Sequence, residues 1–181
     1  MSSPHIRRLR IDDAADVLAG FRADSPEMAL QGEVTDLKSA RTYIEFLTDA
    51  EEGNHGFALE IEHGCMGVVG INAATQHRLG WFFYWAHPQV RNRGLCSAAA
   101  ATVANWALTS HERAGGGFER LELGHRANNP ASGAVARAAG FVREGTERRK
   151  LLINGERIDV HTYGRLPSDP PPQSPLLPME S

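Results

Sequence analysis

The chain contains 181 residues, of which 41% are hydrophobic and 23% are charged, and its formal net charge at pH 7 is −3. That length is enough for one domain with a full hydrophobic core, and the weak negative charge argues against a nucleic-acid partner, because a basic excess is typical of that class. The opening MSSPHIRRLR lacks the apolar segment of a signal peptide and no apolar run approaches the roughly 20 residues of a membrane helix, so we expect a cytoplasmic protein with no membrane partner.

Hydrophobic periodicity and turn residues predict an alternation of strands and helices along the chain. In chain order they predict a strand over 5–11, a helix after Asp12 or Asp13, a helix after Thr35-Asp36, strands over 56–62, 65–74 and 81–85, a helix over 95–108, a strand over 118–124, a helix over 131–139 and two strands around Asn154-Gly155. The order β-α-α-β-β-β-α-β-α-β-β indicates a mixed α/β (α+β) layer architecture.

Three local signals carry most of this prediction. The run WFFYW over 81–85 is strongly typical of a strand. Gly140 is well placed to end a helix, and Asn154-Gly155 is the best two-residue hairpin signal in the chain. The last fifteen residues, PSDPPPQSPLLPMES, contain six prolines and no periodicity, so we expect one domain over 1–166 and a disordered tail over 167–181.

Cysteine and histidine spacing indicates neither a disulfide framework nor a metal site. Cys65 and Cys96 form no CxxC pair. The eight histidines include no HExxH spacing. We therefore expect no bound metal.

The most informative segment, 88–96, joins the aromatic strand to the alanine-rich helix. Arg91, Arg93 and Gly94 lie where that helix begins. The first turn of a helix has free N–H groups and a dipole that favours negative charge, and glycine lets a ligand approach the main chain. This combination indicates a pyrophosphate site, although an ordinary strand-to-helix turn has the same composition. The dinucleotide pattern GxGxxG and the P-loop pattern are absent.

Three motifs in this chain resemble those of the GNAT superfamily of N-acetyltransferases. Residues Arg91-Asn92-Arg93-Gly94-Leu95-Cys96 resemble its Q/R-x-x-G-x-G/A motif, with cysteine in the last small position. Asn129-Pro130-Ala131-Ser132, followed by Gly140-Phe141, is similar to its N-x-x-S and G-F element. The segment from Asn154-Gly155 to Asp159 resembles a hairpin of the RimJ/RimL-type branch, whose members acetylate the N-termini of ribosomal proteins. The element order agrees across 5–166.

The resemblance implies the GNAT fold, a mixed and mostly antiparallel sheet flanked by helices, with a splayed strand pair that holds acetyl-CoA. The backbone of the 91–96 turn would bind the pyrophosphate, the backbone at the end of the aromatic strand would pair with the pantetheine arm, and Asn129 would hydrogen-bond that arm. The alternative role of Asn129 is a helix N-cap. The residues expected to bind the cosubstrate are Trp85, Ala86, His87, Arg91, Asn92, Arg93, Gly94, Leu95, Cys96, Asn129 and Ser132.

By the same resemblance Ser132 would be the general acid that protonates the leaving thiolate, because the tyrosine that many relatives carry before G-F is absent here. Its alternative role is to begin a helix. For the general base, the residues offer Glu122 or His125, each of which could equally be an outward-facing polar residue of a strand. Cys96 is expected to be packed and unreactive rather than a nucleophile.

The expected activity is transfer of an acetyl group from acetyl-CoA to a primary amine by direct attack in a ternary complex. The branch resemblance favours the α-amine of a protein or peptide N-terminus. Two alternatives remain: a small-molecule amine as acceptor, or a non-catalytic acyl-CoA-binding module. The first two helices, the final hairpin and one face of the aromatic strand would form the acceptor pocket, and the resemblance also allows a homodimer.

Overall fold

The computed structural model describes residues 3–180, without the side chain of Thr75. The strands are β1 His5–Arg8, β2 His55–Ile61, β3 Gly64–Ala74, β4 Leu79–Ala86, β5 Arg120–Arg126, β6 Val142–Ile153 and β7 Glu156–Arg165. The α-helices are α1 Ala14–Ala23, α2 Ser25–Met28, α3 Leu37–Leu47, α4 Leu95–Leu108 and α5 Pro130–Ala138. Every predicted element is confirmed to within a few residues at its ends, and the predicted order holds once the short α2 is added.

Local chemistry explains where several elements begin and turn. At the start of α3 the Asp36 carboxylate accepts a hydrogen bond from the Ser39 amide at 2.7 Å, which satisfies one of the free donors of the first turn. The hairpin between β6 and β7 turns at Asn154 and Gly155, whose φ angles of +50° and +82° match the type I′ preference of this dipeptide. No helix within residues 3–180 is long and apolar enough to cross a bilayer.

The strands form one seven-stranded sheet in the order β1-β2-β3-β4-β5-β7-β6. All neighbouring pairs are antiparallel except β4 and β5, which run parallel. Their pairing covers only Leu79 to Trp81 on β4 and Arg120 to Glu122 on β5, and beyond these residues the two strands separate. The mixed, mostly antiparallel sheet that the sequence predicts is confirmed, and the opening in its middle positions the site.

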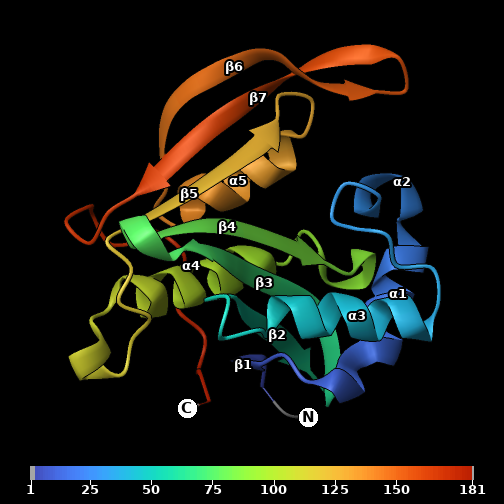
Figure 1. Cartoon of the computed structure of the whole chain (residues 1–181), viewed down its shortest axis with the longest axis horizontal. Coiled ribbons are helices and arrows are strands. Elements are labelled where there is room, and N and C mark those ends of the chain that lie inside the picture. Colours follow the sequence, from blue (N-terminus) through green and yellow to red (C-terminus); the bar gives the residue numbers. More distant parts are fainter. Residues whose placement is uncertain (1–2, 181) are drawn as a thin grey trace.

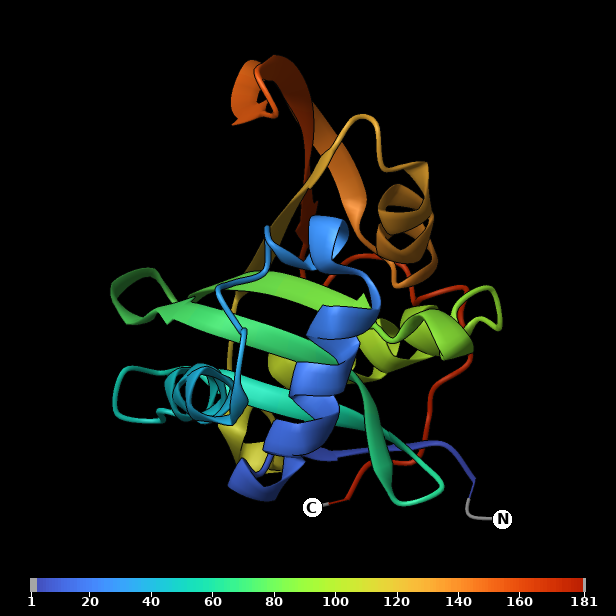
Figure 2. The same cartoon turned by 90° about the vertical axis from the view of Figure 1, so that its right-hand side faces the viewer.

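Helices cover both faces of the sheet (Figures 1 and 2). The larger core lies under α4 and α5, where the alanines of α4 allow the helix to pack closely on large strand side chains. These include Phe57, Ile71, Phe82, Leu121 and Leu123. The second core lies under α1 and α3 on the opposite face and includes Val17, Phe21, Ile44, Val68 and Trp85. The side-chain alternation of a strand therefore places the odd and even residues of β4 in different cores.

The proline-rich tail is docked on the domain, which differs from the disorder that its composition predicts. Met179 forms a parallel bridge with Ile6 of β1, and the Leu177 amide donates to the Thr102 hydroxyl of α4 at 2.8 Å. Leu177 and Met179 also pack against the larger core. The physical reason is tertiary: an isolated tail has no partner for these side chains, whereas the edge strand offers unpaired backbone groups and the core offers an apolar surface.

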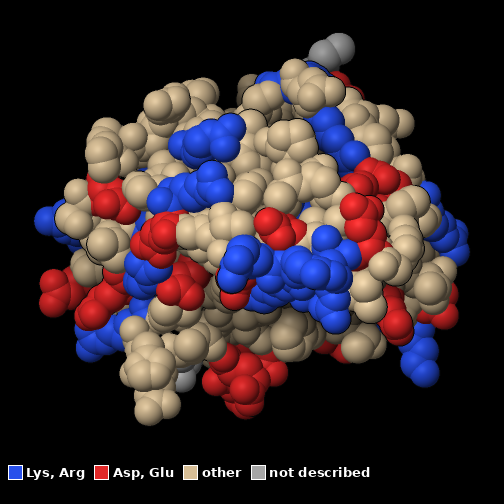
Figure 3. Space-filling model, turned by 90° about the horizontal axis from the view of Figure 1, so that it is seen from above, with Lys and Arg blue, Asp and Glu red and all other residues tan. Residues whose placement is uncertain are grey.

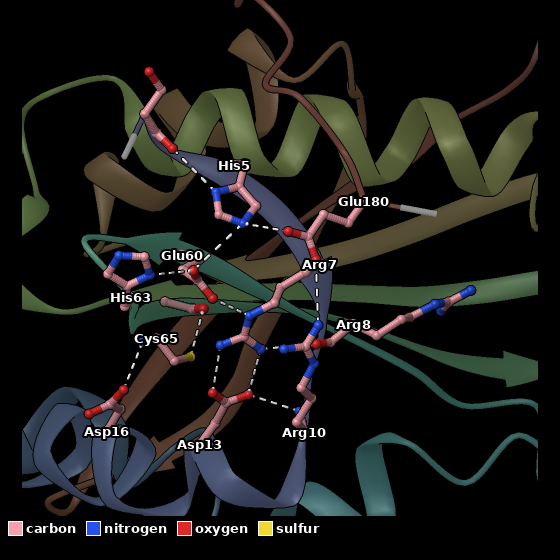
Figure 4. A network of polar contacts seen from close by, with 12 residues as sticks. His5, Arg7, Arg8, Arg10, Asp13, Asp16, Glu60, His63, Cys65 and Glu180 are labelled. Carbon is pink, nitrogen blue, oxygen red and sulfur yellow. Dashed lines mark hydrogen bonds and ion pairs between the residues drawn. The ribbon is translucent and has the colours of Figure 1, made fainter. Parts of the chain in front are cut away.

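A polar network joins the end of the tail to the edge strand (Figure 4). The buried Arg7 guanidinium donates to both carboxylate oxygens of Asp13, at 2.8 and 2.7 Å, and is ion-paired with Glu60. The Arg7 hydrogen bond holds the pKa of Glu60 below its usual value. His5 lies between Glu60 and the Glu180 carboxylate, whose oxygen is 3.1 Å from its Nε2. The network therefore adds polar contacts to the apolar contacts that hold the tail on the domain.

Replacing Leu177 by serine is expected to lower the free energy of unfolding by about 1–2 kcal/mol, because a half-buried leucine loses most of its apolar burial. Leu176 is the matched control, since it is 52% exposed and its replacement by serine should change stability by less than about 0.5 kcal/mol. Chemical denaturation measures both variants. Equal stabilities for the two would contradict a docked tail.

Candidate functional site

The site begins where β4 and β5 separate. A cavity of about 570 Å³ opens there, between the start of α4 and the start of α5. It is lined by Glu27, Met28, Gln31, Tyr84, Trp85, Ala86, Val90, Arg91, Asn92, Gly94, Cys96, Ser97, Asn128, Asn129, Pro130, Ala131, Ser132, Ala134 and Val135. We call it the cofactor cavity, because it brings together most of the residues that the sequence predicts for cosubstrate binding.

The start of α4 forms a cradle of free backbone donors. Gly94 is the N-cap residue with φ +73°, a conformation that favours glycine. The Gly94 carbonyl accepts from Ala98 at 3.0 Å, so the amides of Leu95, Cys96 and Ser97 precede the first helical hydrogen bond. A Cβ built on Gly94 would meet nothing within 4 Å. The geometry fits an anion against the main chain at the positive end of a helix.

The two arginines of this turn do not both point to the cradle. Arg91 Nη1 lies 2.5 Å from Asp24 Oδ2, and its Nε donates to the Ala86 carbonyl at 2.9 Å. Its charge is therefore matched inside the protein, and it fixes the turn to the end of β4 and to the start of α2. Arg93 is exposed and lies outside the cavity lining. The free donors of this turn therefore come from the backbone rather than from a pair of guanidinium groups.

The end of β4 forms the second wall of the cofactor cavity. Trp85 and Ala86 line it, and the missing β5 partner leaves this edge of the strand free of sheet pairing. The indole of Trp85 is fixed from the other face, where its Nε1 donates to the Tyr43 hydroxyl at 3.2 Å. The His87 amide instead donates to the Met66 carbonyl at 2.9 Å, so it belongs to the sheet rather than to the cavity.

A second cavity of about 550 Å³ adjoins the first, and we call it the acceptor cavity. Trp81 and Phe83 line it, as the alternation of the aromatic run predicts, together with the loop before α3 and part of the β6–β7 hairpin. The residues that line both cavities are Glu27, Gln31, Asn129 and Ser132. The two cavities therefore meet at the start of α5.

Asn129 serves the helix that carries Ser132. Its Oδ1 accepts from the Ser132 amide at 3.1 Å, which is the N-cap role that the sequence offers as an alternative to ligand binding. Its Nδ2 donates towards Glu27 Oε2 at 3.4 Å. The side chain also lines both cavities, so capping does not remove Asn129 from contact with a bound molecule.

Ser132 has a close partner on β4 that its motif does not predict. The Tyr84 hydroxyl donates to the Ser132 carbonyl at 2.7 Å and lies 3.3 Å from Ser132 Oγ. Burial raises the pKa of Tyr84 above its ordinary value, so the phenol keeps its proton at neutral pH. A tyrosine is thus present beside the serine, although it comes from the aromatic run and not from the segment before Gly140-Phe141.

The two bases suggested by the sequence lie in less suitable environments. Glu122 accepts from Arg120 Nε at 2.7 Å and lines neither cavity. His125 lines the acceptor cavity, but its Nδ1 donates to the Arg126 carbonyl at 2.8 Å and its Nε2 lies 3.3 Å from the Tyr163 hydroxyl. Burial lowers its pKa. Both imidazole nitrogens are therefore engaged inside the protein.

Cys96 lines the cofactor cavity, where burial raises the pKa of its thiol to about 12. A thiol with such a pKa is almost entirely protonated at neutral pH, which favours the packed, unreactive role. Between residues 3 and 180, no three His, Cys, Asp or Glu side chains are grouped as metal ligands.

The outer rim of the acceptor cavity is strongly charged. Viewed from above, the molecule shows a band of Lys and Arg side chains bordered by Asp and Glu (Figure 3). Lys150 of β6 lines the cavity and is paired with Glu147 at 2.5 Å. Next to it, a register shift between Glu147 and Leu151 interrupts the pairing of β6 with β7 and leaves an open hollow beside Arg148 and Arg149. The rim is thus polar and open to solvent.

The chain is similar to known proteins in both sequence and fold. The family model described as "Acetyltransferase (GNAT) domain" matches residues 5–142. The chain is 27% identical over 111 residues to the ribosomal-protein-serine acetyltransferase of Escherichia coli (strain K12), an alignment that covers 61% of this chain and 59% of that protein. The chain therefore spans less than two thirds of this curated relative.

Two solved structures illustrate the similarity of fold. The ribosomal-protein-S5-alanine acetyltransferase from Vibrio fischeri is 18% identical with a TM-score of 0.77, over 93% of this chain and 96% of that one. RimL, a ribosomal L7/L12 alpha-N-protein acetyltransferase in complex with coenzyme A, is 18% identical with a TM-score of 0.78, over 92% of this chain and 95% of that one. At these identities the likeness concerns the fold.

Proposed function

This chain belongs to the GNAT acetyltransferase family, and on that premise we propose that it transfers the acetyl group of acetyl-CoA to a primary amine. The main support for this proposal is that the two cavities meet at Asn129 and Ser132. One cavity offers a main-chain anion cradle and a free strand edge, while the other is partly aromatic and open to solvent. This arrangement suits direct transfer between two substrates bound at the same time.

The residues of the cofactor cavity have separate tasks in this proposal. Acetyl-CoA supplies an acetyl group on a thioester, which an amine can attack directly. The amides at the start of α4 would hold its pyrophosphate. The edge of β4 at Trp85 and Ala86, which has no strand partner on the β5 side although Arg91 binds the Ala86 carbonyl, would accept the pantetheine arm as an added strand. Ser132, at the boundary between the cavities, would return a proton to the sulfur as the carbon–sulfur bond breaks.

For the acceptor we propose the α-amine of a protein or peptide N-terminus. The curated relative named above acts on a ribosomal-protein serine, and both solved structures are named for ribosomal-protein substrates. In this chain the acceptor cavity continues to the charged rim on β6 and β7. Such an open, polar rim suits a polypeptide whose first residue enters the cavity while the following residues pass outside.

The acceptor class is tested with the whole protein, acetyl-CoA and a panel of N-terminal peptides and small amines. We expect kcat/KM for the better peptides to exceed that for polyamines and aminoglycosides by at least about 10²-fold, because only peptides use the rim for binding. Release of free thiol measures turnover. Faster turnover of a small amine would reassign the acceptor, and CoA binding without turnover of any amine would favour a non-catalytic acyl-CoA-binding module.

A further inference from the structure

We propose that Glu27 of α2 binds the acceptor amine and takes the proton that the amine must lose before it attacks. This role rests on the proposed function, because it concerns the same transfer. An α-amine has a pKa of about 7.7–8.0 and is largely protonated at neutral pH. A protonated amine has no free electron pair, so a nearby proton acceptor is a chemical requirement of the reaction.

Glu27 lies at the boundary between the two cavities. Glu27 is one of the four residues that line both cavities, and it is the only carboxylate in the described lining of either. An ammonium group that reaches the boundary from the acceptor cavity therefore meets one negative side chain. Ser132 lies on the same boundary, so an acid and a proton acceptor are available at the point of transfer.

The protein holds the Glu27 carboxylate through one of its two oxygens. Glu27 Oε2 is ion-paired with Arg126 at the end of β5 and lies 3.4 Å from Asn129 Nδ2. Its other oxygen, Oε1, receives no protein hydrogen bond within residues 3–180. The Arg126 side chain is only 14% exposed, which makes it a firm anchor. One oxygen is thus fixed by the protein, and the other is left for a ligand.

Two ion pairs hold α2, the helix that carries Glu27. Asp24, directly before α2, is bound to Arg91 at the start of α4, while Glu27 is bound to Arg126 on β5. These two ion pairs attach the short helix to both sides of the opening between β4 and β5, and α2 lies at the open end of that gap (Figure 2). A helix of only four residues would otherwise have little reason to keep a fixed position.

The charges that surround Glu27 are consistent with this role. Arg126 is ion-paired with the Glu27 carboxylate, and Lys150, which also lines the acceptor cavity, is already paired with Glu147. His125 lines the same cavity but has both nitrogens engaged. Glu122 lies outside the lining. Among Glu27, Glu122 and His125, only Glu27 both lies at the boundary between the two cavities and has a basic atom free of protein hydrogen bonds.

In this reaction the amine nitrogen loses two protons and the sulfur gains one. One ammonium proton moves to Glu27 Oε1, and the nitrogen electron pair forms the new carbon–nitrogen bond while the carbon–sulfur bond breaks. The leaving sulfur takes the proton of the Ser132 hydroxyl, and the second proton lost by the nitrogen restores that hydroxyl. Glu27 then releases its proton to solvent. The products are an amide and a free thiol.

The experiment compares Glu27→Gln with the unchanged protein on two acceptors that differ only in amine basicity. The first is the best peptide of the panel, and the second is an analogue with a trifluoromethyl group beside the amine, which is mostly unprotonated at neutral pH. We expect kcat/KM to fall by about 10²-fold with the ordinary peptide and by less than about threefold with the analogue. The CoA affinity should be unchanged for the variant. A merely structural role of Glu27 would affect both acceptors alike.

The matched control is Glu33→Gln. Glu33 is an exposed carboxylate of the loop between α2 and α3, and its own side chain lines neither cavity, unlike that of Gln31 in the same loop. This variant should retain full activity on both acceptors. If Glu27→Gln is as active as the unchanged protein, or loses the same factor with both acceptors, the proposed role is overturned while acetyl transfer stands. If the unchanged protein turns over no amine at all, the proposed function falls and the role of Glu27 falls with it.

Discussion

Replacing Gly94 by valine is expected to weaken CoA binding by more than about 100-fold, a loss of at least about 2.7 kcal/mol. Gly94 caps α4 with φ +73°, and a Cβ at this position would project into open space beside the free amides. A branched side chain there would occupy the volume through which the pyrophosphate reaches the main chain. Isothermal titration calorimetry with CoA measures the effect directly.

The control for Gly94 is Gly155→Val in the β6–β7 turn. Gly155 has φ +82°, and a Cβ there would also meet nothing within 4 Å. Both substitutions therefore carry the same kind of backbone strain, about 1–2 kcal/mol for a left-handed residue, but only Gly94 lines the cofactor cavity. Gly155→Val should lose stability and keep CoA affinity. Native affinity in Gly94→Val, or equal losses in the two variants, would contradict the anion cradle.

The parts of the fold that the sequence predicts are those encoded by neighbouring residues. The alanine-rich run that follows Gly94 defines α4, and Asn154-Gly155 defines the last hairpin. The docked tail depends instead on contacts between residues that are distant in the sequence. Leu177 finds its hydrogen-bond partner Thr102 across 75 positions of the chain, so no local pattern within 167–181 could indicate the contact. The four-residue α2 is too short to show helical periodicity.

The same distinction divides the site residues. Gly94, Asn129 and Ser132 belong to short motifs and are found from sequence alone, and the structure brings them around one cavity. Tyr84 and Glu27 reach their partners across 48 and 99 positions respectively, which only the fold reveals. The pairing of Glu122 was foreseeable, because Arg120 lies two residues away on the same face of β5 and is therefore within reach of its carboxylate.

Ser132→Ala is expected to lower kcat by about 10²-fold while the affinity for CoA changes by less than about threefold. The substitution removes only Oγ. The backbone amide still donates to Asn129, and the backbone carbonyl still accepts from Tyr84, so the start of α5 keeps its hydrogen bonds. The loss should therefore appear in turnover, measured as thiol release at saturating acetyl-CoA and acceptor.

The matched control is Ser97→Ala. Ser97 is the third residue of α4, as Ser132 is the third residue of α5, and it lines the cofactor cavity but not the acceptor cavity. Because Ser97 does not lie at the boundary between the two cavities, removal of its hydroxyl should leave kcat within about twofold of the value for the unchanged protein. A comparable loss in both variants would mean that a serine at the start of these helices matters for structure and not for proton transfer.

Tyr84→Phe separates the two hydroxyl groups that lie 3.3 Å apart at this point. If Ser132 delivers the proton and Tyr84 only positions it, the phenylalanine variant should lose about tenfold in kcat and Ser132→Ala about 10²-fold. The reverse order would assign the proton to Tyr84, whose raised pKa keeps the phenol protonated and available as a donor. An unchanged rate in Ser132→Ala would remove Ser132 from the reaction, because this substitution removes the only group of its side chain that can donate a proton.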